Sequence, residues 1–385
     1  MKVIMTGGGT GGHIYPAIAI ADKIKKENPD AEILFVGTER GLEKTLVPQN
    51  GYPIRFIKVR GFDRKNLLKN FQTVKEFAEG SHMAKKIIQE FQPDMVIGTG
   101  GYVCGPVVRM AAKLGIKTYI HEQNAFPGMT NKLLEKYVKK VFISFPEAEK
   151  YFKEPEKMVL SGNPVRESFF HGSRSEARKK LGIPEDCFMV LASGGSRGAL
   201  RINESMIDVA DFLAGHDEVE LYMATGSVFY EQAKAVLAKH IAQSEAPTAA
   251  DSQATAVSAA EGSGAKTRSN IHLMEYIKNM DDYLKAADVV IGRSGALTVS
   301  EITVCGRASI LIPSPNVTGN HQYFNAKAVA DKGGAILIEE KDLTDELLLE
   351  SIMKLKKNRT LLAEMEEAAK KAAPGRACDI IYENI

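Results

Sequence analysis

The sequence predicts an α/β protein built from two doubly wound, Rossmann-like domains that face each other across a cleft. Its 385 residues exceed one ordinary domain and fit two of α/β size. In both halves, short apolar runs alternate with helix-like periods, a rhythm typical of parallel sheets with right-handed crossovers. Three glycine-rich turns each separate such a run from a helix-like segment, at residues 6–13, 99–106 and 193–199. Ligands of such folds bind at the carboxyl ends of the strands.

The first half supplies one series of strands and helices. We expect strands at 3–5, 32–37, 54–59, 95–98, 117–121 and 140–144, and helices at 14–26 and 107–114. The segment 161–166, which contains glycine and proline, is the expected hinge. The first domain should therefore span residues 1–163.

The second half repeats the scheme. We expect strands at 189–193, 220–225, 271–273, 288–292 and 308–313, and helices at 202–213 and 321–331. The stretch 243–269 lacks aromatic residues and is rich in Ala, Ser, Thr, Glu and Gly, which predicts a flexible insertion. A second domain should span 164–342. Helices should follow at 343–385, the last crossing back to the first domain.

The glycine turns predict phosphate ligands. Glycine lets the backbone approach a ligand closely. A helix that begins after such a turn directs free N–H groups and its positive dipole end toward that ligand, most commonly a phosphate. Three such turns in one chain indicate two phosphorylated ligands.

Composition excludes several classes of protein. Apolar residues make up 44% and charged residues 25%, as in ordinary globular proteins, and the net charge of +2 argues against bulk nucleic-acid binding. The four cysteines form no CxxC pair, which predicts reduced thiols rather than disulfides or zinc ligands. A strand that begins at Lys2 leaves no room for a signal peptide, and no apolar run reaches spanning length. We expect a cytoplasmic protein.

Six motifs together carry a family resemblance. They are GGTGGH at 8–13, HEQN at 121–124, GNPVR at 162–166, GGSRGA at 194–199, RSGALTVSE at 293–301 and NHQY at 320–323. Over residues 1 to about 340 the chain resembles the MurG family of bacterial N-acetylglucosaminyltransferases. The resemblance implies the GT-B fold and inverting transfer from UDP-N-acetylglucosamine to lipid I, giving lipid II for peptidoglycan synthesis. It also implies that the first domain faces the acceptor and the membrane, and that the second binds the UDP-sugar.

Inverting transfer requires stabilisation of the departing diphosphate. No Asp-x-Asp pair occurs in the chain, so we expect neither a metal site nor a cofactor. Backbone dipoles of the third glycine turn and the Arg166 side chain could stabilise the leaving group, and the Ser196 hydroxyl could add a donor. The alternative role for Ser196 is an N-cap of its own helix.

The motif at 293–301 follows a strand and opens a helix. Glu301 lies in that helix, where its carboxylate could accept the ribose hydroxyls or simply favour the helix dipole. The resemblance implies that Glu301 holds ribose and that the backbone at Ile277 recognises uracil. It also implies that Gln322 meets the sugar hydroxyls. The same resemblance assigns the lining of the donor pocket to Ala296, Leu297, Thr298, Val299 and Ser300. The family often has a second glutamine where His321 stands.

Two residues are candidates for the general base. His13 lies in the first turn of a helix, whose dipole disfavours the imidazolium and leaves a neutral ring able to accept a proton. A capping or structural role for His13 is the alternative, and Glu122, just past a strand end, is the rival base. The resemblance implies that Thr10, Gly11, Gly12 and Asn124 contact the donor sugar.

The segment 66–77 carries Leu67, Leu68, Phe71, Val74 and Phe77 among the basic residues Arg64, Lys65, Lys69 and Lys75. This pattern suits an anionic lipid surface, although a core-facing helix shows the same period. With the membrane-bound acceptor of the family, it predicts a peripheral protein on the cytoplasmic face of the bacterial membrane. The cell-wall and division machinery are the further partners that the resemblance implies.

Three rival functions stand beside this one. Gly7, Gly9 and Gly12 match the dinucleotide fingerprint of an oxidoreductase, but Gly37 lies near where a ribose-binding acid is expected. A UDP-sugar 2-epimerase has the same two-domain fold and needs no lipid. A non-catalytic binder of sugar nucleotides is the third.

Overall fold

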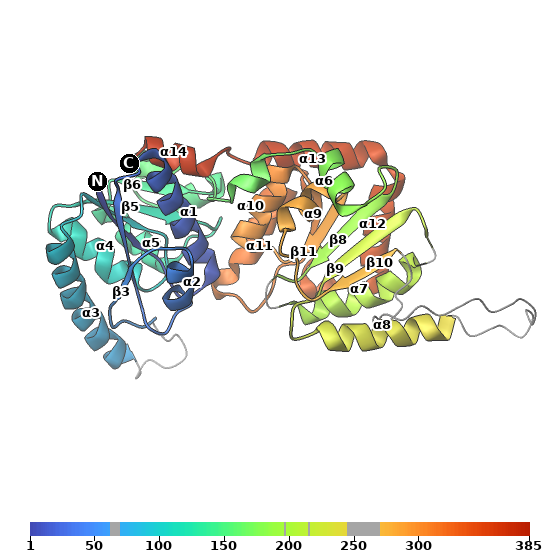
Figure 1. Ribbon diagram of the computed structural model, residues 1–385, viewed down its shortest axis with the longest axis horizontal. Helices are drawn as coiled ribbons and strands as arrows, with labels where there is room; N and C mark the ends of the chain where they lie inside the picture. Colours follow the sequence, from blue (N-terminus) through green and yellow to red (C-terminus); the bar gives the residue numbers. More distant parts are fainter. Residues whose placement is uncertain (62–69, 196–197, 215, 245–269) are drawn as a thin grey trace, which may run out of the picture.

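Two parallel β-sheets form the centres of two lobes (Figure 1). The computed structural model describes residues 1–61, 70–195, 198–214, 216–244 and 270–385. The N-terminal sheet has seven strands in the order β3-β2-β1-β4-β5-β6-β7, and the C-terminal sheet has six in the order β10-β9-β8-β11-β12-β13. Every ladder is parallel. The predicted fold of two doubly wound domains is confirmed.

The N-terminal lobe encloses its sheet between two helical layers. Its strands are β1 (Lys2–Thr6), β2 (Glu32–Gly37), β3 (Ile54–Phe56), β4 (Met95–Gly98), β5 (Lys117–Glu122), β6 (Lys140–Ile143) and β7 (Met158–Leu160). Its helices are α1 (Gly11–Glu27), α2 (Glu43–Gln49), α3 (Asn70–Phe91), α4 (Cys104–Lys113) and α5 (Met129–Leu134). One buried cluster joins the sheet to α3, α4 and α5, and another joins it to α1 and α2.

The C-terminal lobe repeats this arrangement. Its strands are β8 (Phe188–Ser193), β9 (Val219–Ala224), β10 (Ile271–Met274), β11 (Val289–Gly292), β12 (Ala308–Leu311) and β13 (Ala335–Leu337). Its helices are α6 (Arg174–Leu181), α7 (Leu200–Leu213), α8 (Tyr230–Ser244), α9 (Met280–Ala286), α10 (Ala296–Cys305), α11 (His321–Ala330), α12 (Asp345–Lys357) and α13 (Arg359–Ala372). Helices α7, α8, α12 and α13 share one core cluster, and α6, α9, α10 and α11 share the other.

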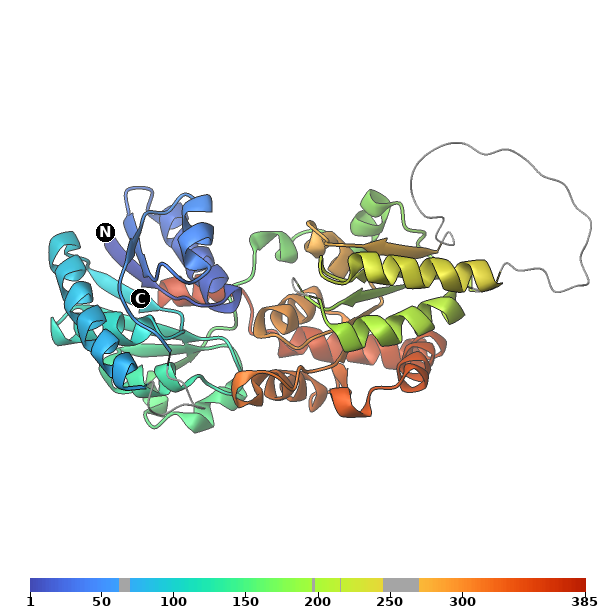
Figure 2. The ribbon, with the colours of Figure 1, turned by 90° about the horizontal axis from the view of Figure 1, so that it is seen from below.

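The chain ends on the lobe where it began. Helix α14 (Ala377–Glu383) lies against α1 in the N-terminal lobe, as Figures 1 and 2 both show. Ile381 is fully buried in the N-terminal core, and Asp379 forms an ion pair of 2.6 Å with Lys23. The two lobes are therefore connected covalently at 161–166 and again between α13 and α14.

The strand order places the motifs at two topological switch points. In the N-terminal sheet the order reverses between β1 and β4, which lead into the first and second glycine turns. In the C-terminal sheet it reverses between β8 and β11, which lead into the third turn and the motif at 293–301. Open parallel sheets bind ligands at such crevices.

Candidate functional site

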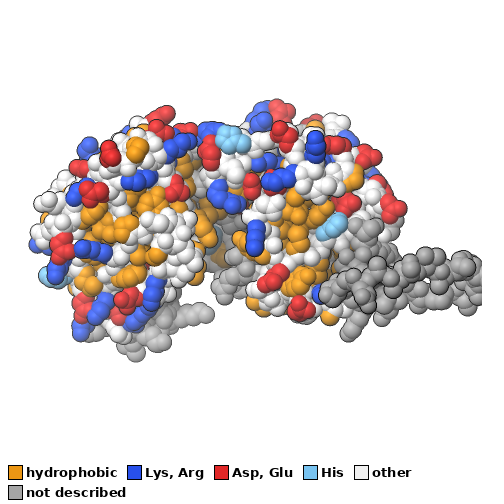
Figure 3. Space-filling view, viewed as in Figure 1, with side chains coloured by type: hydrophobic (Ala, Val, Ile, Leu, Met, Phe, Trp, Pro, Cys, Tyr) orange, Lys and Arg blue, Asp and Glu red, His pale blue; other side chains and the backbone are white. Residues whose placement is uncertain are grey.

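The two switch points lie where the lobes meet. The space-filling view shows a hollowed notch between the lobes (Figure 3). The start of α1 and the loop after β5 bring His13, Gln123 and Asn124 together near this junction, and α10 and α11 bring residues from the C-terminal lobe.

The first two glycine turns pack directly on each other. A Cβ on Gly101 (φ +81°) would stand 2.3 Å from the carbonyl oxygen of Gly8, so no larger residue fits there. Below them, the fully buried Glu43 accepts hydrogen bonds from the Gly9 amide (3.0 Å) and from the Thr38 amide and hydroxyl (2.9 and 2.7 Å). Glu43, which the sequence analysis missed, thus anchors the first glycine turn.

His13 forms hydrogen bonds through its Nδ1, whereas its Nε2 has no hydrogen-bond partner among the described residues. Its Nδ1 lies 3.1 Å from the Thr99 carbonyl oxygen and 3.0 Å from Gln123 Oε1. A Cβ on Gly100 (φ +100°) would stand only 2.8 Å from that Nδ1, so this glycine makes room for the ring. A carbonyl oxygen can only accept, so Nδ1 carries the proton in the neutral ring. Nε2 then keeps its lone pair, as a general base requires.

The neighbouring His121 is a structural residue. It is fully buried, its Nε2 donates to the Gly162 carbonyl (2.9 Å), and its Nδ1 accepts from Gln123 Nε2 (2.8 Å). Burial lowers the pKa of His121 to about 4, so it is neutral at physiological pH.

Glu122 is saturated by donors. Its Oε1 accepts from the Asn124 amide N–H (3.0 Å) and side chain (3.2 Å), and its Oε2 accepts from the Gly128 amide (3.0 Å) and Asn131 Nδ2 (2.8 Å). The side chain is 1% exposed. This arrangement disagrees with the role of Glu122 as rival base, because a carboxylate with four donors has no lone pair directed at a substrate. Glu122 instead fixes the loop that carries Asn124.

The donor candidates gather around the start of α10. Its N-cap is Gly295, which has no side chain to satisfy the first N–H groups, and the helix begins at Ala296. Glu301 accepts no hydrogen bond from the described residues. Burial raises the pKa of the Glu301 carboxyl to about 7, and the nearby Arg166 guanidinium opposes the rise. Arg166 is exposed and stacks over Phe169.

Three other donor candidates have defined positions. Gln322 Oε1 accepts from the Ser314 amide (2.9 Å), which leaves its side-chain N–H groups free for a ligand. Ile277 lies just after β10 and is 3% exposed, so only its backbone is available, as the sequence analysis expected. His321 Nδ1 donates to the Thr318 carbonyl (2.9 Å), leaving Nε2 as an acceptor.

Within α10, one predicted lining residue points elsewhere. Val299 is 1% exposed and packs in the core with Ile302, so its side chain does not line a donor pocket. Ser300 accepts from Asn163 Nδ2 (2.9 Å) and donates to the Ala296 carbonyl (2.9 Å). Ala296, Leu297 and Thr298 are partly exposed on the first turn.

Two buried asparagines join the lobes. Asn163 Nδ2 contacts the Gln123 carbonyl oxygen (3.0 Å) and the Ser300 hydroxyl (2.9 Å), and its Oδ1 has no partner among the described residues. Asn325 accepts from the Ala125 amide (2.8 Å) and donates to Asn124 Oδ1 (3.2 Å). Neither asparagine was singled out from sequence. They connect the loop next to His13 to helices α10 and α11 of the C-terminal lobe.

Two predicted regions are partly outside the described residues. Ser196 lies outside them, so both of its predicted roles stay predictions; the N-cap residue of α7 is Ala199. Leu67 and Leu68 also lie outside, while Val74 on α3 is 61% exposed and Phe77 packs against the core. The predicted insertion begins inside α8, and its residues 245–269 are not described.

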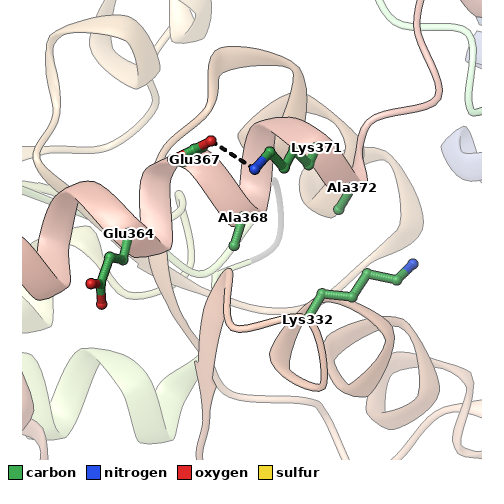
Figure 4. Close-up of a pocket in the computed structure, with 6 residues that line it drawn as sticks. All are labelled: Lys332, Glu364, Glu367, Ala368, Lys371 and Ala372. Carbon is green, nitrogen blue, oxygen red and sulfur yellow. Dashed lines mark ion pairs between the residues drawn. The ribbon is translucent and has the colours of Figure 1, made fainter.

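Three further features of the described residues concern metal binding, membrane spanning and cavities. No group of three or more His, Cys, Asp or Glu side chains there could hold a metal ion. No described helix is long and apolar enough to cross a membrane. A cavity of about 440 Å³ lies between Lys332 and α13, where Lys371 pairs with Glu367 (Figure 4), and it shares no residue with the lobe junction.

Known proteins resemble this chain along its whole length. Residues 3–143 match the model of the Glycosyltransferase family 28 N-terminal domain, and residues 189–377 match that of the Glycosyltransferase family 28 C-terminal domain. A relative from Acetivibrio thermocellus is 47% identical, covering 100% of this chain and 97% of the relative. One from Halalkalibacterium halodurans is 43% identical, covering 96% and 94%. Both are named UDP-N-acetylglucosamine--N-acetylmuramyl-(pentapeptide) pyrophosphoryl-undecaprenol N-acetylglucosamine transferase.

Solved structures agree with the sequence relatives. The crystal structure of Acinetobacter baumannii MurG matches with a TM-score of 0.75 at 26% identity, covering 100% of this chain and 99% of that one. A UDP-GlcNAc 2-epimerase from Neisseria meningitidis matches with a TM-score of 0.64 at 12% identity, covering 100% and 99%. The second likeness shows a shared fold alone.

Proposed function

The chain belongs to the MurG family of glycosyltransferases with the GT-B fold, and from that premise we propose how its residues carry out the family's reaction. It transfers N-acetylglucosamine from UDP-N-acetylglucosamine to the 4-hydroxyl of the muramyl sugar of lipid I, giving lipid II for peptidoglycan synthesis. The observation that carries the mechanism is the state of His13, whose Nδ1 is committed to acceptors inside the protein while Nε2 is unused.

His13 is the general base in this proposal. Its Nε2 takes the proton of the acceptor hydroxyl as that oxygen attacks the anomeric carbon of the donor. The bond between the anomeric carbon and the diphosphate oxygen breaks in the same displacement, so the configuration inverts and UDP leaves. Glu122 does not compete for this role, because its carboxylate is occupied in holding the Asn124 loop.

The leaving diphosphate gains negative charge as it departs. We assign its stabilisation to the uncapped first turn of α10, the third glycine turn before α7 and the exposed Arg166 guanidinium. Ser196 stays a predicted hydroxyl donor to the same group.

In this proposal the C-terminal lobe binds most of the donor. Glu301, with no internal hydrogen bond in the described structure, accepts the ribose hydroxyls, and the Gln322 amide N–H groups meet the sugar. The Ile277 backbone recognises uracil. From the N-terminal lobe, Thr10, Gly11, Gly12 and Asn124 contact the donor sugar, while the first two glycine turns also face the lipid diphosphate.

The acceptor is a lipid, so the protein must meet a membrane surface. The basic and apolar segment 66–77 supports peripheral attachment to anionic lipid on the cytoplasmic face. Contact with the cell-wall and division machinery stays a prediction from the family, with no surface assigned to it.

Product analysis tests the proposal. With UDP-N-acetylglucosamine and lipid I, we expect lipid II and UDP, and with the nucleotide sugar alone we expect no epimerised sugar. Turnover should survive chelation of divalent ions by EDTA, since backbone dipoles and Arg166 stabilise the leaving group. Loss of turnover in EDTA that a metal restores would refute that account of the leaving group. Release of an epimerised sugar without lipid would refute the transferase mechanism.

A further inference from the structure

We propose that Gln123 is a positioning residue, which holds His13 in its base-competent tautomer without placing a negative charge beside it. The inference rests on the proposed role of His13 as base. Gln123 belongs to the motif at 121–124, within which the proposed mechanism uses only Asn124 and Glu122.

The orientation of the Gln123 amide is fixed by its surroundings. Its Nε2 lies 2.9 Å from the Thr99 carbonyl oxygen and 3.2 Å from the His121 carbonyl oxygen, and both oxygens can only accept. Rotating the amide by 180° would place Oε1 against a carbonyl oxygen at each of these two contacts, where neither oxygen can donate. Nε2 must therefore face these carbonyls, which leaves Oε1 directed at His13 Nδ1.

The residue is also locked in place as a whole. Its side chain is 2% exposed, and the two N–H groups of Nε2 are shared among the two carbonyl oxygens and His121 Nδ1 (2.8 Å). Asn163 Nδ2 donates to the Gln123 carbonyl oxygen (3.0 Å). Ser300 on the donor helix binds the same Asn163 side chain. The position of the His13 ring is thus tied, through Gln123 and Asn163, to the start of the donor site.

The absence of charge at Gln123 has a chemical reason. A carboxylate at this distance would raise the pKa of the imidazole by about 1–3 units. The diphosphates of donor and acceptor act in the same direction when bound, and an imidazolium cannot accept a proton. A carboxamide orients the ring through the same contact and adds no charge beside it.

The ionisable groups of the neighbouring elements do not supply that charge. The carboxylates of Glu43 on α2 and Glu122 on β5 are held by internal donors, and among the described residues the hydrogen-bond partners of the His13 ring are Thr99 and Gln123 rather than either carboxylate. His121 is neutral, and burial raises the pKa of Cys104 on α4 to about 12, which keeps that thiol neutral as well. The Tyr102 ring from the second turn lies over Gly9. Gln123 is therefore the position at which a charge would act on His13.

The test compares Gln123→Glu with Gln123→Met in the full-length enzyme. The dependence of kcat on pH should show its acidic limb moved up by about 1–3 units in Gln123→Glu, so that activity lost at pH 7 returns at higher pH. Gln123→Met removes the same hydrogen bonds without adding charge. It should lower kcat about tenfold with its acidic limb near that of the wild type. Gln49→Glu, an exposed substitution on α2, is the matched charge control and should leave the profile unchanged.

A spectroscopic measurement follows the tautomer directly. The ¹⁵N spectrum of the His13 ring should show Nδ1 protonated and Nε2 bare in the wild type. In Gln123→Met only the Thr99 carbonyl still favours this tautomer, so a detectable fraction of the other tautomer should appear. Identical pH profiles for Gln123→Glu and Gln123→Met, or an Nε2-protonated ring in the wild type, would overturn the inference.

The inference and the proposed function can fail separately. If His13→Ala keeps wild-type kcat, the base lies elsewhere and the proposed function fails whatever Gln123 does. If His13→Ala is inactive but Gln123→Glu keeps the wild-type profile, only the inference about Gln123 fails. Calorimetric affinity for UDP, which binds the other lobe, should stay the same in both Gln123 variants, and a melting temperature near that of the wild type shows that each variant is folded.

Discussion

The two switch points use the same sequence of strand, turn and helix, yet they treat their polar groups in opposite ways. In the N-terminal lobe, His13 Nδ1, Gln123 and the carboxylates of Glu43 and Glu122 are all hydrogen-bonded inside the protein. In the C-terminal lobe, Glu301 accepts no hydrogen bond from the described residues, and burial raises the pKa of its carboxyl to about 7. The polar groups at the N-terminal switch point are therefore paired before a ligand binds, whereas the Glu301 carboxylate at the C-terminal switch point has no hydrogen-bond partner among the described residues.

This difference agrees with the roles proposed for the two lobes, which are base catalysis in the N-terminal lobe and nucleotide binding in the C-terminal lobe. A base must be oriented before the reaction, so its supporting hydrogen bonds have to exist in the free enzyme. A nucleotide brings its own hydroxyls and phosphates, so the groups that bind it must be unpaired beforehand. The acceptor side should therefore respond to mutation in kcat, and the donor side in affinity.

The largest expected effect is that of His13→Ala on turnover. Loss of a general base removes an interaction made only as the bond forms, so kcat should fall about 10²–10⁴-fold while UDP affinity stays the same. Steady-state kinetics with lipid I, paired with calorimetry for UDP, measures both.

Glu122→Gln is the matched control for that prediction. The substitution replaces one acceptor oxygen by an N–H group that would face the donors of Gly128 or Asn131, so it should lower the melting temperature by loosening the loop. If His13→Ala kept most of its kcat and folded Glu122→Gln lost it, the base would be Glu122.

The second effect is on the donor side. Glu301→Ala removes the carboxylate that we propose accepts the ribose hydroxyls. Such a charge-assisted contact is worth about 1.5–3 kcal/mol, so UDP should bind roughly 10- to 150-fold more weakly. Glu231→Ala, an exposed substitution on α8, is the control and should leave the affinity unchanged. Unchanged calorimetric affinity in Glu301→Ala would remove this residue from the donor site and erase the contrast between the lobes.

Most of the fold could be predicted because each element has a local signal. The strands predicted at 32–37 and 95–98 match β2 and β4 to the residue. Strands β7 and β13 were missed, since each has three residues and lies at a sheet edge, where pairing rather than sequence pattern defines it.

The site was predictable only where a motif lies on one turn. The hydrogen-bond partners of Glu43, Asn163 and Asn325 lie up to about 200 residues away in the chain, and no local sequence pattern predicts such contacts. Val299 is different, because its spacing of three from Ile302 on one helix was a readable sign that it faces the core.

A third prediction concerns stability and follows from the raised pKa of Glu301, about 7 in the folded protein against 4.5 as the reference. A carboxyl with a raised folded pKa binds its proton more tightly when folded, so its contribution is fully present below about pH 4.5 and is lost as pH rises through 7. Glu301→Gln, which stays neutral, should therefore exceed the wild type by about 1–2 kcal/mol at pH 8 and match it at pH 4.5. Denaturant unfolding at the two pH values measures this. Equal stability at pH 8 would show that the free Glu301 carboxylate costs the donor side nothing.

The smallest expected effect tests whether the membrane belongs to one lobe only. On α3 of the N-terminal lobe, Val74 is 61% exposed and lies between Lys69 and Lys75 in the sequence, so a vesicle of anionic lipid should bury it at little cost. Val74→Glu replaces an apolar contact with a charge that anionic lipid repels, so binding in a sedimentation assay should weaken by about 1 kcal/mol, roughly fivefold, and most clearly at low salt. Val228→Glu makes the same change at a position 72% exposed on the C-terminal lobe and should have no effect. Equal losses in both variants would mean that vesicles do not distinguish the lobes, and a loss in Val228→Glu alone would move the membrane face to the donor side. Either result would contradict the assignment of the lipid surface to the N-terminal lobe alone. In the first case both lobes would meet the vesicle, and in the second the exposed Val74 would not be in contact with lipid.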